Sequence, residues 1–138
     1  MKSRSLLIPV LLYVVGATGD NLLTYWFVVV RRDFYEANPF VAPFIYSHPL
    51  YMWFLRDLAA LALVIALALG YRKIILTLSP PNRARLFRIA SKYWIIVLAA
   101  SIARILPVIH NLLLIFFGIE TPLSKLPLLI AKLLGPSS

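Results

Sequence analysis

The chain lacks cysteine and glutamine, and only five of its 138 residues are acidic. Without cysteine, disulfide bonds, thiolate catalysis and cysteine-based metal sites are excluded. The joint lack of two thermolabile residue types is consistent with a thermophilic source. Charged residues make up only 14% of the chain, whereas hydrophobic residues make up 62%. Because so small a chain cannot bury that much apolar surface inside a globule, we expect an integral membrane protein with lipid as its solvent.

The few acids leave a large excess of positive charge. Lysine and arginine number 14, and the net charge is +9. On a soluble protein this excess would indicate nucleic acid, but in a membrane protein it is explained by topology and by anionic lipid headgroups. We therefore expect membrane lipids as partners, with a homo-oligomer or a larger membrane complex possible, and neither nucleic acid nor a cofactor.

Three long apolar runs predict three transmembrane helices, at about Leu6 to Val30, Leu50 to Gly70 and Trp94 to Gly118. Each is long enough for a hydrocarbon core of about 30 Å, which needs about 20 helical residues. The first run resembles a signal peptide at its start, but the apolar pattern resumes from Leu22, so we expect a retained helix. Pro107 lies inside the third run and is predicted to kink it.

The connecting segments also carry signals. The proline-rich, aromatic segment Asp33–Pro49 predicts a loop that lies along the membrane surface. A short apolar piece, Ile74–Leu78, precedes a predicted turn at Ser79–Asn82. Basic and apolar residues alternate over Arg83–Lys92, which predicts an amphipathic, interfacial start to the third helix.

The tail, residues 121–138, is expected to differ from the transmembrane helical domain, residues 1–120. Its apolar run is too short to span a bilayer and is interrupted by Lys132. We therefore predict an interfacial helix, with a fourth crossing as the alternative. Its apolar stripe would sit in the acyl boundary, or else pack on the bundle or a second subunit. That stripe consists of Leu126, Leu129, Ile130 and Leu133. The expected fold is thus all-α, a polytopic membrane helical bundle.

The distribution of basic residues predicts the topology. Eight lie on one side of the expected spans and four on the other. The first group is Lys2, Arg4, Arg72, Lys73, Arg83, Arg85, Arg88 and Lys92; the second is Arg31, Arg32, Lys125 and Lys132. By the positive-inside rule, the N-terminus is predicted to be cytoplasmic in a multi-pass protein of the cell membrane, with the C-terminus outside.

Four charged residues fall inside the predicted spans. Each costs about 2.5–3.5 kcal/mol at the centre of a bilayer, so they are expected to meet. At about 1.5 Å rise per residue, their depths are similar enough for long arginine side chains to bridge. We predict Asp20 beside Arg56, and Asp57 beside Arg104 or His110.

These charges and their polar neighbours form the candidate site. It comprises Asp20, Asn21, Thr24, Glu36, Asn38, Arg56, Asp57, Arg104, His110 and Asn111. A neutral network of this kind locks helices in register, whereas intramembrane charges by default mark a pathway or a site. The residues leave both interpretations open. His110 has no second ligand at metal spacing, so we expect no metal.

Two short motifs carry a family likeness. The segments Asp20-Asn21-Leu22-Leu23-Thr24 and Glu36-Ala37-Asn38-Pro39 fit the pattern D-x-x-x-T followed by E-x-N-P. This pattern resembles a family of small prokaryotic membrane proteins classed as a domain of unknown function. The basic residue and the asparagine that the family tends to carry are matched by Arg56 and Asn111, although arginine replaces lysine. The resemblance implies a compact helical membrane domain without a known activity.

The loop motif has a physical interpretation of its own. Asn38 precedes a proline and should be extended, which lets Glu36 fold back toward Arg56. Alternatively, Glu36 pairs with Arg31 or Arg32 at the surface, where an ion pair contributes little.

Two classes of function compete. The first is a structural or accessory subunit with a buried polar cluster, favoured because no phosphate loop, catalytic triad or zinc motif is present. The second is an oligomeric conduit for ions, protons or small solutes that uses the intramembrane charges. A membrane enzyme with Asp20 and His110 as acid and base comes third, so we do not expect an enzyme.

Overall fold

The computed structural model describes residues 6–36, 38–77, 83–126, 129–130 and 132. Within that part of the chain all regular structure is helical, as predicted. The elements are α1 (Leu7–Thr24), the π-helical η1 (Tyr25–Val30), α2 (Ala42–Ser47), α3 (Leu50–Thr77), α4 (Arg83–Ala90), α5 (Trp94–Phe117) and the 3₁₀-helical η2 (Pro122–Ser124).

Three helical stretches are long and apolar enough to cross a membrane, at Leu7–Val30, Leu50–Thr77 and Arg88–Phe117. Many large apolar side chains on them point outward; Ile8, for example, is 68% exposed. Exposing such apolar side chains to water would be unfavourable, whereas contact with lipid is favourable. The predicted three-helix membrane bundle is therefore confirmed.

The second and third spans differ from the predicted boundaries. α3 continues to Thr77, so the piece at Ile74–Leu78 is not a separate element as far as the described residues reach. The predicted interfacial start of the third span forms a helix of its own, α4, and a turn separates it from α5. The turn expected at Ser79–Asn82 lies outside the described residues. α5 continues through Pro107, where the kink stays a prediction.

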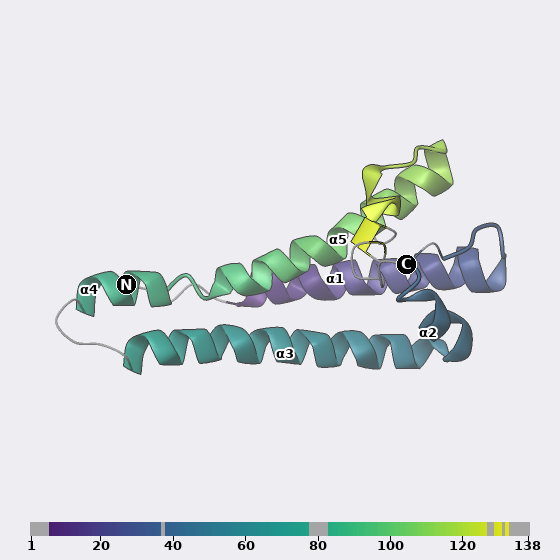
Figure 1. Cartoon of the computed structure of the whole chain (residues 1–138). Helices are drawn as coiled ribbons and strands as arrows, with labels where there is room; N and C mark the ends of the chain where they lie inside the picture. Colours follow the sequence, from purple (N-terminus) through teal and green to yellow (C-terminus); the bar gives the residue numbers. More distant parts are fainter. Residues whose placement is uncertain (1–5, 37, 78–82, 127–128, 131, 133–138) are drawn as a thin grey trace.

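α1 and α5 run parallel and side by side, and α3 packs against them in the opposite direction (Figure 1). Close approach of α1 to α5 depends on a glycine. A Cβ added at Gly16 would lie 2.9 Å from the backbone carbon of Arg104, so a larger residue would push the helices apart. The Ser101 hydroxyl, which is fully buried, donates a hydrogen bond of 2.6 Å to the Pro9 carbonyl. The apolar core of the three helices consists of Tyr13, Ala17, Leu61, Ala68, Tyr93 and Val97.

The segment between α1 and α3 folds back onto the end of the bundle. Its start is marked by Arg32, whose φ of 59° places it in the left-handed region. The indole Nε1 of Trp53 donates to the His48 carbonyl at 3.1 Å, and the Trp53 ring meets the Tyr25 ring edge-on at 5.9 Å. These contacts tie α2 and the following turn to the first and second spans.

The tail begins with η2, after which the backbone is helical at Leu126, Leu129, Ile130 and Lys132. The first three side chains of the predicted apolar stripe are exposed, so they do not pack on the bundle. The fourth, Leu133, lies outside the described residues. An interfacial position for the tail stays a prediction.

Candidate functional site: an intramembrane charge network

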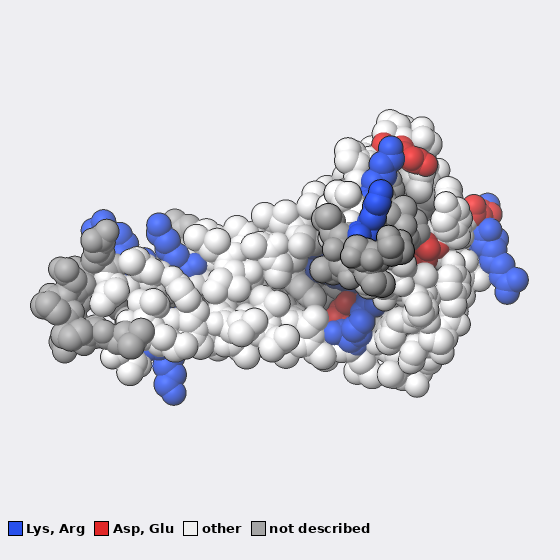
Figure 2. All heavy atoms as spheres, viewed as in Figure 1, with Lys and Arg blue, Asp and Glu red and all other residues white. Residues whose placement is uncertain are grey.

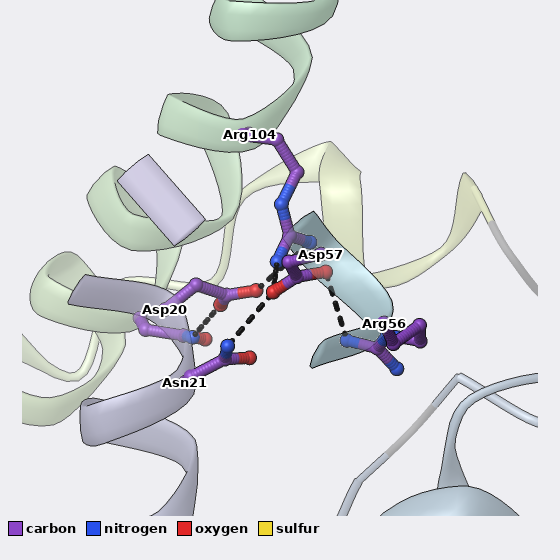
Figure 3. Close-up of polar contacts among 6 residues, drawn as sticks. Asp20, Asn21, Arg56, Asp57 and Arg104 are labelled. Carbon is purple, nitrogen blue, oxygen red and sulfur yellow. Dashed lines mark hydrogen bonds and ion pairs between the residues drawn. The ribbon is translucent and has the colours of Figure 1, made fainter. Parts of the chain in front are cut away.

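Six polar side chains from the three spans meet between the helices, and we call them the charge network. They are Asp20 and Asn21 of α1, Arg56 and Asp57 of α3, and Arg104 and Asn111 of α5. Two aspartates and two arginines make the network electrically neutral. Figure 3 shows the acidic groups and the arginines turned toward one another.

Asp57 is the centre of the network. Its Oδ2 accepts hydrogen bonds from Nη2 of Arg104 at 2.5 Å and from Nδ2 of Asn21 at 2.7 Å. Its Oδ1 accepts a longer bond of 3.4 Å from Nη2 of Arg56. Only 8% of the Asp57 side chain is exposed, so one carboxylate links all three spans away from solvent.

Asp20 completes the second half of the network. Its Oδ1 accepts from Nδ2 of Asn111 at 3.1 Å, and its Oδ2 accepts from Nη1 of Arg104 at 3.5 Å. Arg104 therefore bridges both aspartates, and each of the four carboxylate oxygens accepts a hydrogen bond. Nε of Arg104 is the exception among these groups, because it is buried and has no hydrogen-bond partner within the described residues.

The packing of α1 on α5 brings these groups together. Gly16 lets the backbone of Arg104 approach, and Gly19, three residues further, faces Val108. Asp20 follows Gly16 by one helical turn, so it lies on the same face of α1. Small residues thus set the register in which Asp20 meets the arginine and Asn111.

One predicted pair is confirmed and the other is wrong. Asp57 pairs with Arg104 as expected, but Asp20 also pairs with Arg104 rather than with Arg56. Arg56 and Asp57 are adjacent on α3 and therefore point about 100° apart. With Asp57 turned inward, Arg56 lies at the edge, 35% exposed, with its guanidinium 4.9 Å from the centre of the Phe44 ring.

Two candidate residues on the spans, His110 and Thr24, lie outside the network. Nδ1 of His110 hydrogen-bonds to the Thr121 hydroxyl at 2.7 Å, which joins α5 to the tail. His110, the alternative predicted partner of Asp57, therefore does not pair with it. The Thr24 hydroxyl makes no hydrogen bond to the Asp20 carboxylate in the described structure. Two further contacts were not predicted from the sequence: Ser101, a lone hydroxyl in an apolar run, bonds to Pro9, and Phe44 lies against Arg56.

Glu36 and Asn38 each accept a backbone N–H from two residues further along the chain. The Glu36 carboxylate accepts the Asn38 backbone N–H at 2.8 Å, and Asn38 Oδ1 accepts the N–H of Phe40 at 3.0 Å. Neither predicted partner of Glu36 is confirmed: among the described residues it has no ion pair with Arg56, and Arg31 pairs with Asp33 instead.

Two charges of the network nevertheless affect the pKa of Glu36. Burial raises the pKa of its carboxyl above the ordinary value, and the negative charge of Asp20 raises it further. The Asn38 N–H and the positive charge of Arg56 act in the opposite direction and lower the pKa. The loop carboxylate thus lies within electrostatic range of both α1 and α3.

In the described part of the chain no three His, Asp or Glu side chains are grouped to hold a metal ion. No family model, curated protein or solved structure matches the chain. The likeness to a family of small prokaryotic membrane proteins therefore stays a prediction.

Proposed function

We propose that this membrane protein is a structural or accessory subunit in which the charge network holds three spans in one register. The observation that supports this most is the hydrogen bonding of both carboxylates. All four carboxylate oxygens of Asp20 and Asp57 accept hydrogen bonds from the chain's own side chains, and the charges cancel. A neutral, hydrogen-bonded network is what a register lock needs.

A conduit is the second candidate, and one observation favours it. Nε of Arg104 is buried without an acceptor. A buried polar group of this kind is commonly satisfied by an ordered water, and a chain of waters is what proton or ion transfer would need. Against this, both aspartates already bind arginine, so each transfer step would have to break a charge-assisted hydrogen bond.

The accessory part of the proposal draws support from the outward face of α3. Ala59, Ala62 and Ala66 are exposed on it, and nothing lies within 4 Å of a Cβ added at Gly70. Small residues at this spacing let membrane helices approach each other closely. We infer that another membrane helix packs here.

The proposed topology puts the N-terminus and the connection from residue 71 to residue 92 in the cytoplasm of a cell whose membrane the protein spans. The excess of lysine and arginine at that end supports this orientation. Reporter fusions at residue 78 and residue 138 are expected on opposite sides. Reports from the same side would mean that the tail crosses and that four spans exist.

Proton flux separates the two candidate functions. The full chain is reconstituted in vesicles that contain a pH-sensitive dye, and an imposed pH gradient is followed over time. We expect the gradient to decay as in protein-free vesicles, and we expect Asp57→Asn to lower thermal stability without changing the decay. Rapid decay with the wild-type chain that Asp57→Asn abolishes would establish the conduit instead.

The accessory role is tested by the size of the complex that mild detergent extracts from native membranes. We expect the wild-type chain to migrate well above the monomer, and Ala66→Leu to return it to the monomer. Ala103→Leu is the matched control, because Ala103 is exposed on α5. A monomeric wild-type chain, or equal loss in both variants, would contradict the accessory role.

A further inference from the structure

The end of the molecule that carries α4 has positive charge without a compensating acid. Residues 58–119 contain neither Asp nor Glu, and the same holds for residues 1–19. The described basic side chains at this end, which we call the basic end, are Arg72, Lys73, Arg88 and Lys92. None of the four forms an ion pair within the described structure. Figure 2 shows lysine and arginine here, while acidic side chains appear only toward the α2 end.

One of these cations is held in place. The Arg72 guanidinium lies 5.2 Å from the centre of the Tyr93 ring, and Tyr93 is only 5% exposed. A buried aromatic ring fixes the arginine from one side and leaves its N–H groups for an anion. Lys92 directly precedes Tyr93, and Lys73 directly follows Arg72, so two further cations lie on the same two segments.

The residue types at the basic end are those that collect at the headgroup level of a bilayer. Tyr71, Tyr93 and Trp94 lie beside the cations, and such aromatic residues collect at the headgroup level of a bilayer. Ile74 and Ile89 are 58% and 39% exposed next to them. Cations beside exposed apolar side chains can contact the charged headgroup and the acyl chains of one lipid together.

We propose that Arg72, together with Lys73 and Lys92, binds the phosphate of an anionic lipid in the leaflet that surrounds the basic end. Charge complementarity decides the occupant: the basic end supplies cations and no acid, and an anionic headgroup supplies the negative charge. A basic surface between transmembrane helices is a known type of headgroup site. This inference does not depend on whether the charge network is a lock or a conduit.

The test measures lipid preference on the full chain. The protein in mixed micelles with equal amounts of phosphatidylglycerol and phosphatidylcholine is examined by native mass spectrometry, and the ratio of the bound lipids is recorded. We expect the wild-type chain to retain phosphatidylglycerol preferentially. Because each basic residue near a membrane surface contributes about 1 kcal/mol, Arg72→Gln should reduce the preference about fivefold. Replacing Arg72, Lys73 and Lys92 together by Gln should reduce it more than tenfold.

The control variant removes the same charge from the other end, with Arg32, Lys125 and Lys132 replaced by Gln. These side chains are exposed, and their loss should leave the preference unchanged. Melting in neutral detergent checks that each variant folds. If the triple variant fails to fold, the wild-type chain still decides the question: its preference should vanish at high salt, which screens the charges.

Three outcomes would overturn the proposal. They are no preference in the wild-type chain, equal loss in the control variant, and a preference that persists at high salt. Displacement of the lipid by inorganic phosphate at equal concentration would assign the site to a free anion. Displacement by a short RNA would assign it to nucleic acid.

Discussion

The charge network and the basic end place the same residue type in opposite electrical settings. Arg104 lies between two spans, where the carboxylates of Asp20 and Asp57 each bind one of its nitrogens. Arg72 lies near the end of a span, against an aromatic ring, with no acid in its surroundings. Inside the bundle the chain supplies its own counter-charge, whereas at its end we infer that the lipid does.

The difference shows how a chain with so few acids uses them. Two of its three aspartates lie within spans, where an unpaired arginine would be most costly. At the basic end solvent and headgroups can compensate charge, so acids are not needed there. Substitutions at the two places should therefore have very different effects on folding.

The largest expected effect comes from Arg104→Ala. It strands two aspartates between the helices, and removing one partner of a buried ion pair typically costs about 3–5 kcal/mol. The matched substitution Arg72→Ala at the basic end should change the free energy of unfolding by less than about 1 kcal/mol. Denaturant titration in neutral detergent measures both, and equal losses would erase the distinction between the two regions.

Glycine substitutions give a second, smaller contrast. In Gly16→Ala the new Cβ would lie 2.9 Å from the backbone of Arg104, so the helices must shift, at a cost of about 1–3 kcal/mol. Gly70→Ala meets nothing within 4 Å and should be neutral or stabilising by up to about 1 kcal/mol. Thermal melting of the two variants decides this, and a tolerated Gly16→Ala would mean that α1 and α5 are not tightly packed.

Arg56→Ala tests the edge of the charge network. Arg56 makes one long hydrogen bond of 3.4 Å and a ring contact, and 35% of its side chain is exposed. We expect a loss of about 1 kcal/mol or less, since partly exposed ion pairs and ring contacts contribute little. A loss as large as that of Arg104→Ala would show that Arg56 neutralises Asp57 as strongly as Arg104 does.

The smallest expected effect is a pH dependence at Glu36. Its pKa is raised above the ordinary 4.5 by burial and by Asp20, so the folded chain holds this proton more tightly than the unfolded chain. Its contribution to stability is therefore full below pH 4.5 and is lost as pH rises through the raised pKa.

Glu36→Gln should remove that pH dependence and leave stability at neutral pH equal or slightly higher. The exposed Glu120→Gln serves as the control. Melting temperatures recorded from acid to neutral pH compare the variants. An unchanged pH profile in Glu36→Gln would show that Glu36 is not the group responsible.

Much of the fold follows from hydropathy, because a span must be a long apolar helix. The runs that contain Leu58–Leu69 and Trp94–Phe117 could hardly form anything else. The end of α3 was harder to predict, since Arg72 and Lys73 look like an exit from lipid although the helix continues to Thr77. Charged residues indicate where a span leaves the lipid, but the helix itself can continue into the headgroup region and beyond.

Six of the ten candidate residues meet in the charge network, whereas Thr24, Glu36, Asn38 and His110 do not, and the pairing within the network was harder to predict. Depth along each helix follows from residue counting, and it correctly brought Asp57 and Arg104 to one level. The rotation of each helix and the choice of neighbour do not follow from counting. They depend on side-chain packing, here at Gly16 and at the Ser101–Pro9 contact, which turned Asp20 toward Arg104 instead of Arg56.

A double-mutant cycle on Asp57→Asn and Arg104→Gln tests most directly whether the charge network locks α3 to α5. The free energy of unfolding is measured for the wild type, both single variants and the double variant in neutral detergent. If the pair holds the helices together, the double variant should lose less than the two single losses combined, with a coupling above about 1 kcal/mol. Additivity within about 0.3 kcal/mol would contradict the lock.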